Sequence, residues 1–244
     1  MNYVISDIHG CYSQYAELLN KISFSDKDEL FVLGDVVDRG PEPIKVLRDM
    51  MMRPNVTLIL GNHEYIMYKV LSKLAVEITD ENAENHVTAD DLMDFTYWMQ
   101  DGGGVTMEQF RRLDADEQAD ILDYISDASA YEIVRAGGKR YVLVHAGING
   151  FQPGKALDDY DYSDFLFYRA DYGRRYFKDQ NTYLVTGHTP TPSIREDKEP
   201  EVYRENGHIA MDCGCFFSGR LACLCLETGE VVYAGEDKAN LSQE

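Results

Sequence analysis

Short apolar runs alternate with amphipathic segments along the first 60 residues of the chain. The runs at residues 2–6, 29–33 and 56–60 are predicted strands, because each is short, apolar and followed directly by Asp or Gly. Residues 12–21 and 41–52 space their apolar side chains for one buried helical face. This alternation of strands and helices predicts an α/β protein with a largely buried sheet.

The remainder of the chain predicts further helices and strands. The segment at about 64–130 is helix-rich and acidic, and Gly102-Gly103-Gly104 is expected to break it between helices. Residues 140–145 and 183–187 are predicted buried strands, and 202–234 is predicted to form a β-meander with glycine-containing turns. We expect a single domain over residues 1–244, with an acidic helical insertion at about 76–125.

Residues that can bind metals gather at the ends of five predicted strands. The motifs, in chain order, are Asp7-Ile8-His9, Gly34-Asp35-Val36-Val37-Asp38-Arg39-Gly40, Gly61-Asn62-His63-Glu64, His145-Ala146-Gly147 and Gly187-His188-Thr189. Four of the chain's six histidines lie in these motifs. Because loops at the carboxyl ends of strands carry functional groups in α/β proteins, we expect one shared site.

The residue types in these motifs indicate a particular chemistry. Imidazole and carboxylate together suit Mn, Fe, Zn or Co, and no cysteine stands at these strand ends. Two metal ions ~3.5–4 Å apart, sharing a carboxylate, would activate water and neutralise charge on phosphoryl oxygens. An arginine would add a bidentate partner for the same oxygens. The motifs therefore predict two-metal hydrolysis of a phosphoester.

The ordered set of motifs resembles the calcineurin-like metallophosphoesterases, and within them the phosphoprotein phosphatase branch in its bacterial and phage form. The resemblance runs from residue 5 to residue 189, and the tail Met211-Asp212-Cys213-Gly214-Cys215 also looks like that branch. It implies two packed mixed β-sheets flanked by helices, with the metal site along one edge.

The resemblance implies a role for each matching residue. The implied metal ligands are Asp7 and His9 for the first ion, Asp35 as the bridge, and Asn62, His145 and His188 for the second. His63 would protonate the leaving oxygen, oriented by Asp38, and Arg39 would bind phosphate. Manganese is expected, with iron or zinc as alternatives. No Ser or Cys stands in the motifs as a nucleophile, so no phosphoenzyme is expected.

The resemblance also implies a second phosphate-binding arginine between the last two metal histidines. The candidates are Arg169, Arg174 and Arg175. Arg169 is preferred because it follows the apolar run at residues 165–167.

The substrate has more than one interpretation. The D-R-G and G-N-H-E motifs favour a serine/threonine phosphoprotein phosphatase that cleaves phosphate monoesters. A dinucleoside polyphosphate hydrolase shares D-x-H, G-D and G-N-H, although such enzymes more often carry other residues where this chain has Asp38 and Glu64. A small-molecule phosphomonoesterase is a further alternative. A non-catalytic metal-bound scaffold is disfavoured, because His63 and the arginines are retained.

The net charge of −20 limits the partners. An acidic surface repels nucleic acid and anionic lipid, so neither is expected as a partner, and a phosphate site needs local positive charge such as metal ions. No apolar run approaches the ~20 residues of a membrane span. Five cysteines without a leader-like N-terminus predict reduced thiols in the cytoplasm.

Four residues outside the motifs receive structural interpretations. Trp98 and Tyr97 are predicted to pack the helical insertion on the core without contacting substrate. His86 and His208 are predicted surface residues. Glu64, although it lies in a motif, is expected to support the site rather than to bind metal.

Overall fold

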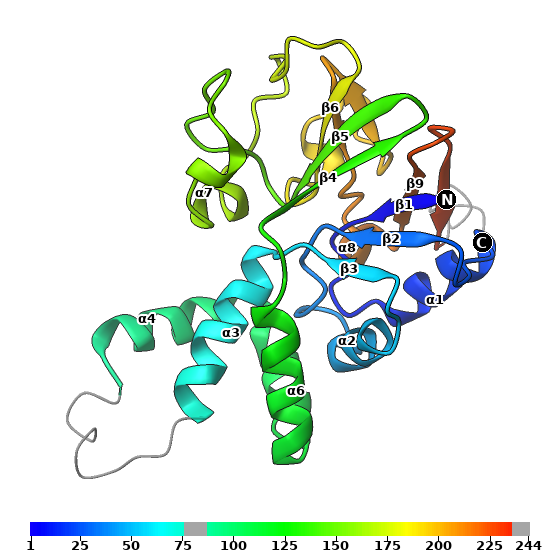
Figure 1. Cartoon of the computed structure of the whole chain (residues 1–244). Helices are drawn as coiled ribbons and strands as arrows, with labels where there is room; N and C mark the ends of the chain where they lie inside the picture. The colour runs from blue at the N-terminus through cyan, green and yellow to red at the C-terminus, as the bar shows by residue number, and fades with distance from the viewer. Residues whose placement is uncertain (76–86, 236–244) are drawn as a thin grey trace.

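A computed structural model describes residues 1–75 and 87–235, and its strands form two five-stranded sheets (Figure 1). The first sheet, in the order β10-β9-β1-β2-β3, consists of Val231–Ala234, Leu221–Cys225, Asn2–Ile5, Glu29–Val32 and Val56–Leu58. The second, in the order β4-β5-β6-β8-β7, consists of Tyr131–Ala136, Lys139–Val144, Thr182–Thr186, His208–Ala210 and Tyr203–Glu205. Both sheets contain parallel and antiparallel pairs, so the expected pair of mixed sheets is confirmed.

The two sheets pack through side chains that alternate across each strand. In β5, Tyr141 and Leu143 join Val4 of the first sheet in one buried cluster. The intervening Val142 and Val144 belong to another cluster, on the outer face of the second sheet. Because successive side chains of a strand point to opposite faces, the apolar run buries both faces of β5, as a strand between two layers requires.

Helices cover the outer faces of the sheets. The helices α1 (Tyr12–Lys21) and α2 (Pro43–Met51) bury Leu18 and Met50 completely against the first sheet, and both match the predicted helical segments. The short helices α7 (Ser163–Leu166) and η2 (Leu157–Asp159) lie beside the second sheet. Two further short helices are η3 (Thr191–Ser193) and α8 (Cys215–Ser218).

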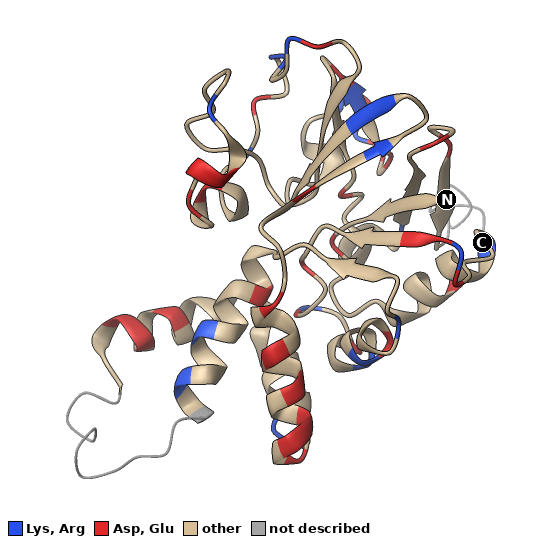
Figure 2. Cartoon of the chain, viewed as in Figure 1, with Lys and Arg blue, Asp and Glu red and all other residues tan. Residues whose placement is uncertain are grey.

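A group of helices extends beyond β3, at the lower left of Figure 1. It comprises α3 (Asn62–Ala75), α4 (Ala89–Trp98), η1 (Met99–Gly103), α5 (Gly104–Phe110) and α6 (Ala115–Ser126). Gly102 has φ 102°, which interrupts the helix where the three glycines predicted a break. Acidic residues run along α4 and α6 (Figure 2). Residues 76–86, including His86 and the start of the predicted insertion, lie outside the described residues, and the single-domain organisation stays a prediction.

Two sequence predictions need correction, and one strand was missed. The segment 202–234 is not one meander, because β7 and β8 pair in the second sheet whereas β9 and β10 pair in the first. β4 was not predicted, because its alternating polar and apolar residues directly follow the acidic helical segment. His208 is 1% exposed rather than at the surface, since it lies in β8 and stacks on Tyr172.

Across the residues that the structure describes, no helix is both long and apolar enough to span a membrane.

Candidate active site

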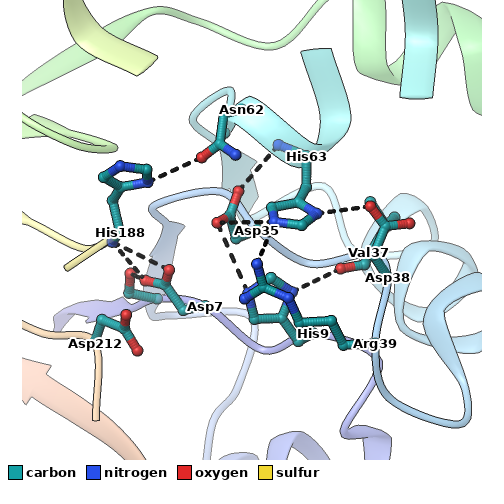
Figure 3. A network of polar contacts seen from close by, with 12 residues as sticks. Asp7, His9, Asp35, Val37, Asp38, Arg39, Asn62, His63, His188 and Asp212 are labelled. Carbon is teal, nitrogen blue, oxygen red and sulfur yellow. Dashed lines mark hydrogen bonds and ion pairs between the residues drawn. The ribbon is translucent and has the colours of Figure 1, made fainter. Parts of the chain in front are cut away.

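The motif residues of both sheets come together just beyond the carboxyl ends of their strands, and Figure 3 shows most of them from close by. Each strand contributes residues from the loop or helix that follows it. These are Asp7 and His9 after β1, Asp35, Asp38 and Arg39 after β2, Asn62 and His63 at the start of α3 after β3, His145 after β5, and His188 after β6. The shared site expected from the sequence is therefore assembled in space.

Unusual backbone conformations set the direction of these side chains. Six site residues have φ between 45° and 69°, namely Asp7, His9, Asp35, Asp38, Arg39 and His188. The left-handed region costs a non-glycine residue about 1–3 kcal/mol and concentrates at functional sites. Gly187 is required for a different reason, because a Cβ there would come within 2.3 Å of Asp7 Oδ2.

Asp35 lies at the centre of two groups that could each hold a metal ion. His9, Asp35 and His63 form one group and Asp35, His145 and His188 form the other. Within each group the potential ligand atoms all lie within 4.8 Å of one another. A carboxylate shared between two groups of imidazoles matches the donor set of a two-metal centre, so the residues present fit divalent metal ions.

Hydrogen bonds to the backbone orient the imidazole rings of His9 and His145 towards Asp35. The Nδ1 atom of His9 donates to the carbonyl oxygen of Val37 over 2.9 Å, and that of His145 donates to Leu33 over 2.6 Å. Both residues are thereby held as the tautomer whose Nε2 lone pair faces the site. Asn62 Oδ1 lies 2.9 Å from His145 Nε2 and 3.0 Å from His188 Nδ1, between the two rings.

The electrostatics of the centre favour cations. Burial lowers the pKa of His9 to about 3 and that of His188 to about 4, so both rings are neutral and can donate lone pairs. Burial alone would raise the pKa of Asp35, but electrostatic interactions with the surrounding histidines, led by His145 and His63, hold it below its usual value. The result is a buried acidic side chain beside imidazole nitrogens, a donor set that suits a cation.

A second pair of acidic side chains, Asp7 and Asp212, lies buried beside Asp35. Burial raises the pKa of Asp7 well above its usual value, and the neighbouring Asp212 and Asp35 raise it further. Burial likewise raises the pKa of Asp212 to about 7. Asp7 accepts the backbone N–H of His188 over 3.1 Å to each oxygen. Asp7 does not belong to either three-residue group, so its ligand role rests on its position in the motif.

His63 has partners on both ring nitrogens. Its Nδ1 donates to Asp38 Oδ2 over 2.7 Å, and its Nε2 lies 3.2 Å from Asp101 Oδ2. Burial alone would lower the pKa of His63, but Asp35, Asp101 and Asp38 together raise it well above its usual value. An imidazole with a raised pKa, whose Nδ1 is fixed by a carboxylate, is arranged as a proton donor.

The helical group completes the support of Asp38. Trp98 Nε1 donates to Asp38 Oδ2 over 2.9 Å, and Thr106 Oγ1 donates to Asp38 Oδ1 over 2.6 Å. Trp98 is 1% exposed, so the prediction that it packs this segment on the core is confirmed. Tyr97 differs, because it is 50% exposed and lines the cavity over the site.

Two arginines line the same cavity, which has a volume of about 560 Å³. Arg39 Nη2 lies 2.9 Å from His63 Nε2. Arg169 also lines the cavity, and its charge contributes to the lowered pKa of His188. Of the other candidates, Arg174 stacks on Tyr176 and Arg175 donates to backbone carbonyls of residues 177–182, so the geometry favours Arg169 among the three.

Glu64 lies beneath the site and is fully buried. Its two carboxylate oxygens accept four backbone N–H groups, those of Asp35, Val36, Val37 and Gly61, over 2.7–3.2 Å. These bonds tie the loop after β2 to the start of α3. Glu64 therefore supports the site, as the sequence analysis expected.

Glu64→Gln is expected to lower the free energy of unfolding by about 1–3 kcal/mol, because the amide NH₂ would face backbone N–H groups that need an acceptor. Urea unfolding of the metal-loaded protein would measure it. Glu108→Gln, at an exposed position, is the matched control. An unchanged midpoint for Glu64→Gln would contradict a supporting role.

Sequence reasoning missed several residues of the cavity. Asp212 follows β8 in a segment whose resemblance to the family was noted without a role. Asp101, Tyr97 and Phe217 also line the cavity, but they belong to helical segments that no strand-end rule selects. The one sequence feature that could have drawn attention to Asp101 is the change from an acidic helical segment to three glycines directly after it.

Comparison with known proteins agrees with this geometry. Residues 3–219 match the family of calcineurin-like phosphoesterases, and the chain belongs to that family. Its class is therefore that of the metallophosphoesterases, a family of phosphoesterases that use divalent metals.

Curated relatives include tetraphosphatases of two kinds. The chain is 30% identical over 166 residues to a symmetrical bis(5'-nucleosyl)-tetraphosphatase of Buchnera aphidicola subsp. Schizaphis graminum, covering 67% of this chain and 55% of that protein. It is 27% identical to the asymmetrical bis(5'-nucleosyl)-tetraphosphatase PrpE of Geobacillus sp., covering 89% and 87%. The chain thus aligns with about half or less of the length of several symmetrical enzymes but with most of the asymmetrical one.

Solved structures share the fold. A candidate diadenosine tetraphosphatase superposes with a TM-score of 0.62 at 20% identity, over 97% of this chain and 93% of that one. A protein serine/threonine phosphatase from Saccharomyces cerevisiae superposes with a TM-score of 0.57 at 12% identity, over 97% and 80%. At these identities the likeness concerns the fold alone.

Proposed function

We propose that the protein hydrolyses dinucleoside polyphosphates, cleaving a phosphoanhydride bond at a two-metal centre. One observation carries this proposal: the cavity joins the metal-binding groups and two arginines to two exposed aromatic rings, Tyr97 and Phe217. Their side chains are 50% and 64% exposed. Exposed aromatic rings stack on nucleobases, whereas arginines and metals bind phosphates. The tetraphosphatase relatives support the same class of substrate.

The proposed metal ligands are those of the motifs. Asp7, His9 and Asp35 would hold one ion, and Asp35, Asn62, His145 and His188 the other. Manganese is the first candidate, with iron and zinc as alternatives. When bound, the ions would activate water and neutralise charge on the phosphoryl oxygens.

The chain's own side chains would perform the remaining steps. Arg39 and Arg169 would hold oxygens of the phosphoryl group that is attacked, each as a charge-assisted partner. His63 would deliver its Nε2 proton to the departing phosphate oxygen, while Asp38 holds the opposite nitrogen at 2.7 Å. Among the described residues that line the cavity there is no Ser or Cys, which supports direct hydrolysis without a phosphoenzyme.

The phosphoprotein substrate favoured by the D-R-G and G-N-H-E motifs has less support. The curated relatives compared above are nucleotide hydrolases. Asp38 and Glu64 are the residues on which the phosphoprotein phosphatase interpretation depended. Asp38 orients His63, and Glu64 accepts hydrogen bonds from backbone N–H groups. Neither task depends on the substrate.

The test compares three substrates on the Mn-loaded protein: diadenosine tetraphosphate, p-nitrophenyl phosphate and a phosphoserine peptide. We expect the highest kcat/KM for diadenosine tetraphosphate. Chromatography of the products separates symmetrical cleavage, which yields two ADP, from asymmetrical cleavage, which yields ATP and AMP. Faster hydrolysis of the phosphopeptide, with no nucleotide product from diadenosine tetraphosphate, would instead favour a phosphoprotein phosphatase.

Removing an aromatic ring from the cavity should impair nucleotide substrates selectively. Tyr97→Leu and Phe217→Leu are each expected to lower kcat/KM for diadenosine tetraphosphate by about tenfold, because stacking of a base contributes about 1–3 kcal/mol. Hydrolysis of p-nitrophenyl phosphate should change less than twofold. Tyr162→Leu is the matched control, since Tyr162 is 51% exposed and lies outside the cavity lining. Equal losses for both substrates would argue against base stacking.

A further inference from the structure

Asp101 occupies an unexpected position for an acidic residue, on the wall of a cavity that must bind phosphate. Its Oδ1 lies 2.8 Å from Arg39 Nη2, and its Oδ2 lies 3.2 Å from His63 Nε2. The side chain is 32% exposed, so it faces the cavity rather than the core. One carboxylate therefore bridges the proposed phosphate-binding arginine and the proposed proton donor.

The backbone holds this carboxylate in place. The N–H of Arg39 donates to the carbonyl oxygen of Gly102 over 3.1 Å, and Arg39 Nε donates to the carbonyl oxygen of Asp101 over 3.4 Å. Gly102 has φ 102°, and a Cβ there would come within 2.7 Å of Arg39 Cγ. The turn at η1 is thus closely packed on Arg39, and Asp101 stays near the site when its side chain rotates.

Any phosphoryl group that reaches Arg39 and His63 must approach the same nitrogen atoms that Asp101 contacts. Its oxygens then lie beside a carboxylate whose pKa is lowered: burial alone would raise that pKa, but His63 and Arg39 hold it at about 2. Repulsion between like charges grows with the charge of the incoming group. A terminal phosphoryl group carries about −1.5 to −2 near neutral pH, whereas an internal phosphate of a polyphosphate chain carries one negative charge.

We propose that Asp101 is a specificity-determining residue that favours internal, singly charged phosphates over terminal, doubly charged phosphoryl groups. This rests on the proposed function in that Asp101 faces the same phosphate site. It would direct the enzyme towards the inside of a polyphosphate chain, and away from the phosphate monoesters that are chemically similar to its products.

Two aryl phosphates with the same leaving group test this charge preference. p-Nitrophenyl phosphate presents a terminal phosphoryl group and bis(p-nitrophenyl) phosphate presents a singly charged diester. In Asp101→Asn the ratio of kcat/KM for the monoester to that for the diester is expected to rise by about tenfold, as one unit of repulsion is removed. The asparagine keeps the size of the side chain and an oxygen that can accept from Arg39.

Asp116→Asn, on the exposed acidic face of α6, is the control that changes net charge equally away from the cavity. Asp101→Ser serves as a second neutral variant. The affinity of the Mn-loaded protein for inorganic phosphate, measured by calorimetry, should rise by a similar factor in both Asp101 variants and stay unchanged in the control.

An unchanged ratio with unchanged phosphate affinity would overturn the proposal, and so would a ratio that falls. An equal loss of kcat for both substrates would show that Asp101 only positions Arg39 and His63. These outcomes are independent of the test of the proposed function, which is judged by the products of diadenosine tetraphosphate in the unmodified protein.

Discussion

Replacing His63 by asparagine is expected to lower kcat by about 10²–10⁴-fold while metal content stays unchanged. The imidazole is 2% exposed and is held by Asp38 on one nitrogen and faces Asp101 with the other. Asparagine cannot deliver a proton at neutral pH, but it is polar and smaller, so the surrounding hydrogen bonds can be kept in part. Steady-state kinetics and metal analysis of the purified variant would measure both quantities.

The dependence on the leaving group identifies His63 as an acid. p-Nitrophenolate leaves readily without a proton, whereas phenolate benefits more from protonation. The loss in kcat should therefore be larger for phenyl phosphate than for p-nitrophenyl phosphate. Equal losses for the two esters, or a loss that follows reduced metal content, would assign His63 to metal binding with His9 and Asp35, the group to which it belongs by distance.

Asp35→Asn is expected to reduce bound metal from two ions to one or none, and to lower kcat/KM by about 10³-fold or more. Asp35 is the one residue common to both metal-binding groups, and its oxygens lie 3.4 Å from His145 Nε2 and 3.8 Å from His9 Nε2. Asparagine keeps the shape but removes the charge and one of the two anionic oxygens that could contact both ions. Metal analysis after gel filtration, together with kinetics at saturating Mn, would measure the effect.

Metal removal provides the companion measurement. Chelation should lower the Tm of the unmodified protein, because ligands that bind only the folded state stabilise it by about 2.7 kcal/mol at a hundredfold excess over Kd. In Asp35→Asn the Tm should respond much less to added Mn. A full Mn-induced rise in Tm, with two ions bound, would contradict the assignment of Asp35 as the bridge.

The sequence predicted the strand-end site well for a physical reason. Each motif follows a buried strand whose apolar run is easily recognised, and parallel strands deliver their carboxyl ends to the same edge. Asp7 and Asp35, which follow neighbouring parallel strands of the first sheet, could therefore be placed together without a structure. The supporting role of Glu64 was also predicted, because Glu64 directly follows Asn62 and His63 in the same motif.

Other features of the fold and of the site depend on tertiary packing, which the local pattern of apolar and polar residues does not encode. Residues 202–234 alternate as a meander should, yet Gly214 with φ 71° lies where the chain passes from one sheet to the other, and no turn rule distinguishes the two sheets. His208 was expected at the surface because it lies outside the strand-end motifs, but it is buried in β8, between β6 and β7. Asp101 and Phe217 reach the cavity through tertiary placement of short helical segments, and their spacing alone carries no sign of it.

The contacts of Trp98 and Thr106 with both oxygens of Asp38 have a consequence for the minimal size of the catalytic unit. A shortened chain that retained both sheets and every motif residue, but lacked residues 98–106, would leave the carboxylate behind His63 without two of its donors and Arg39 without its backbone tether to Gly102. A shortened version of this protein would have to keep residues 98–106, or a designed loop would have to supply equivalent hydrogen-bond donors. Within the helices beyond β3, residues 98–106 therefore support the site directly, whereas the start of α4 near residue 89 is open to redesign.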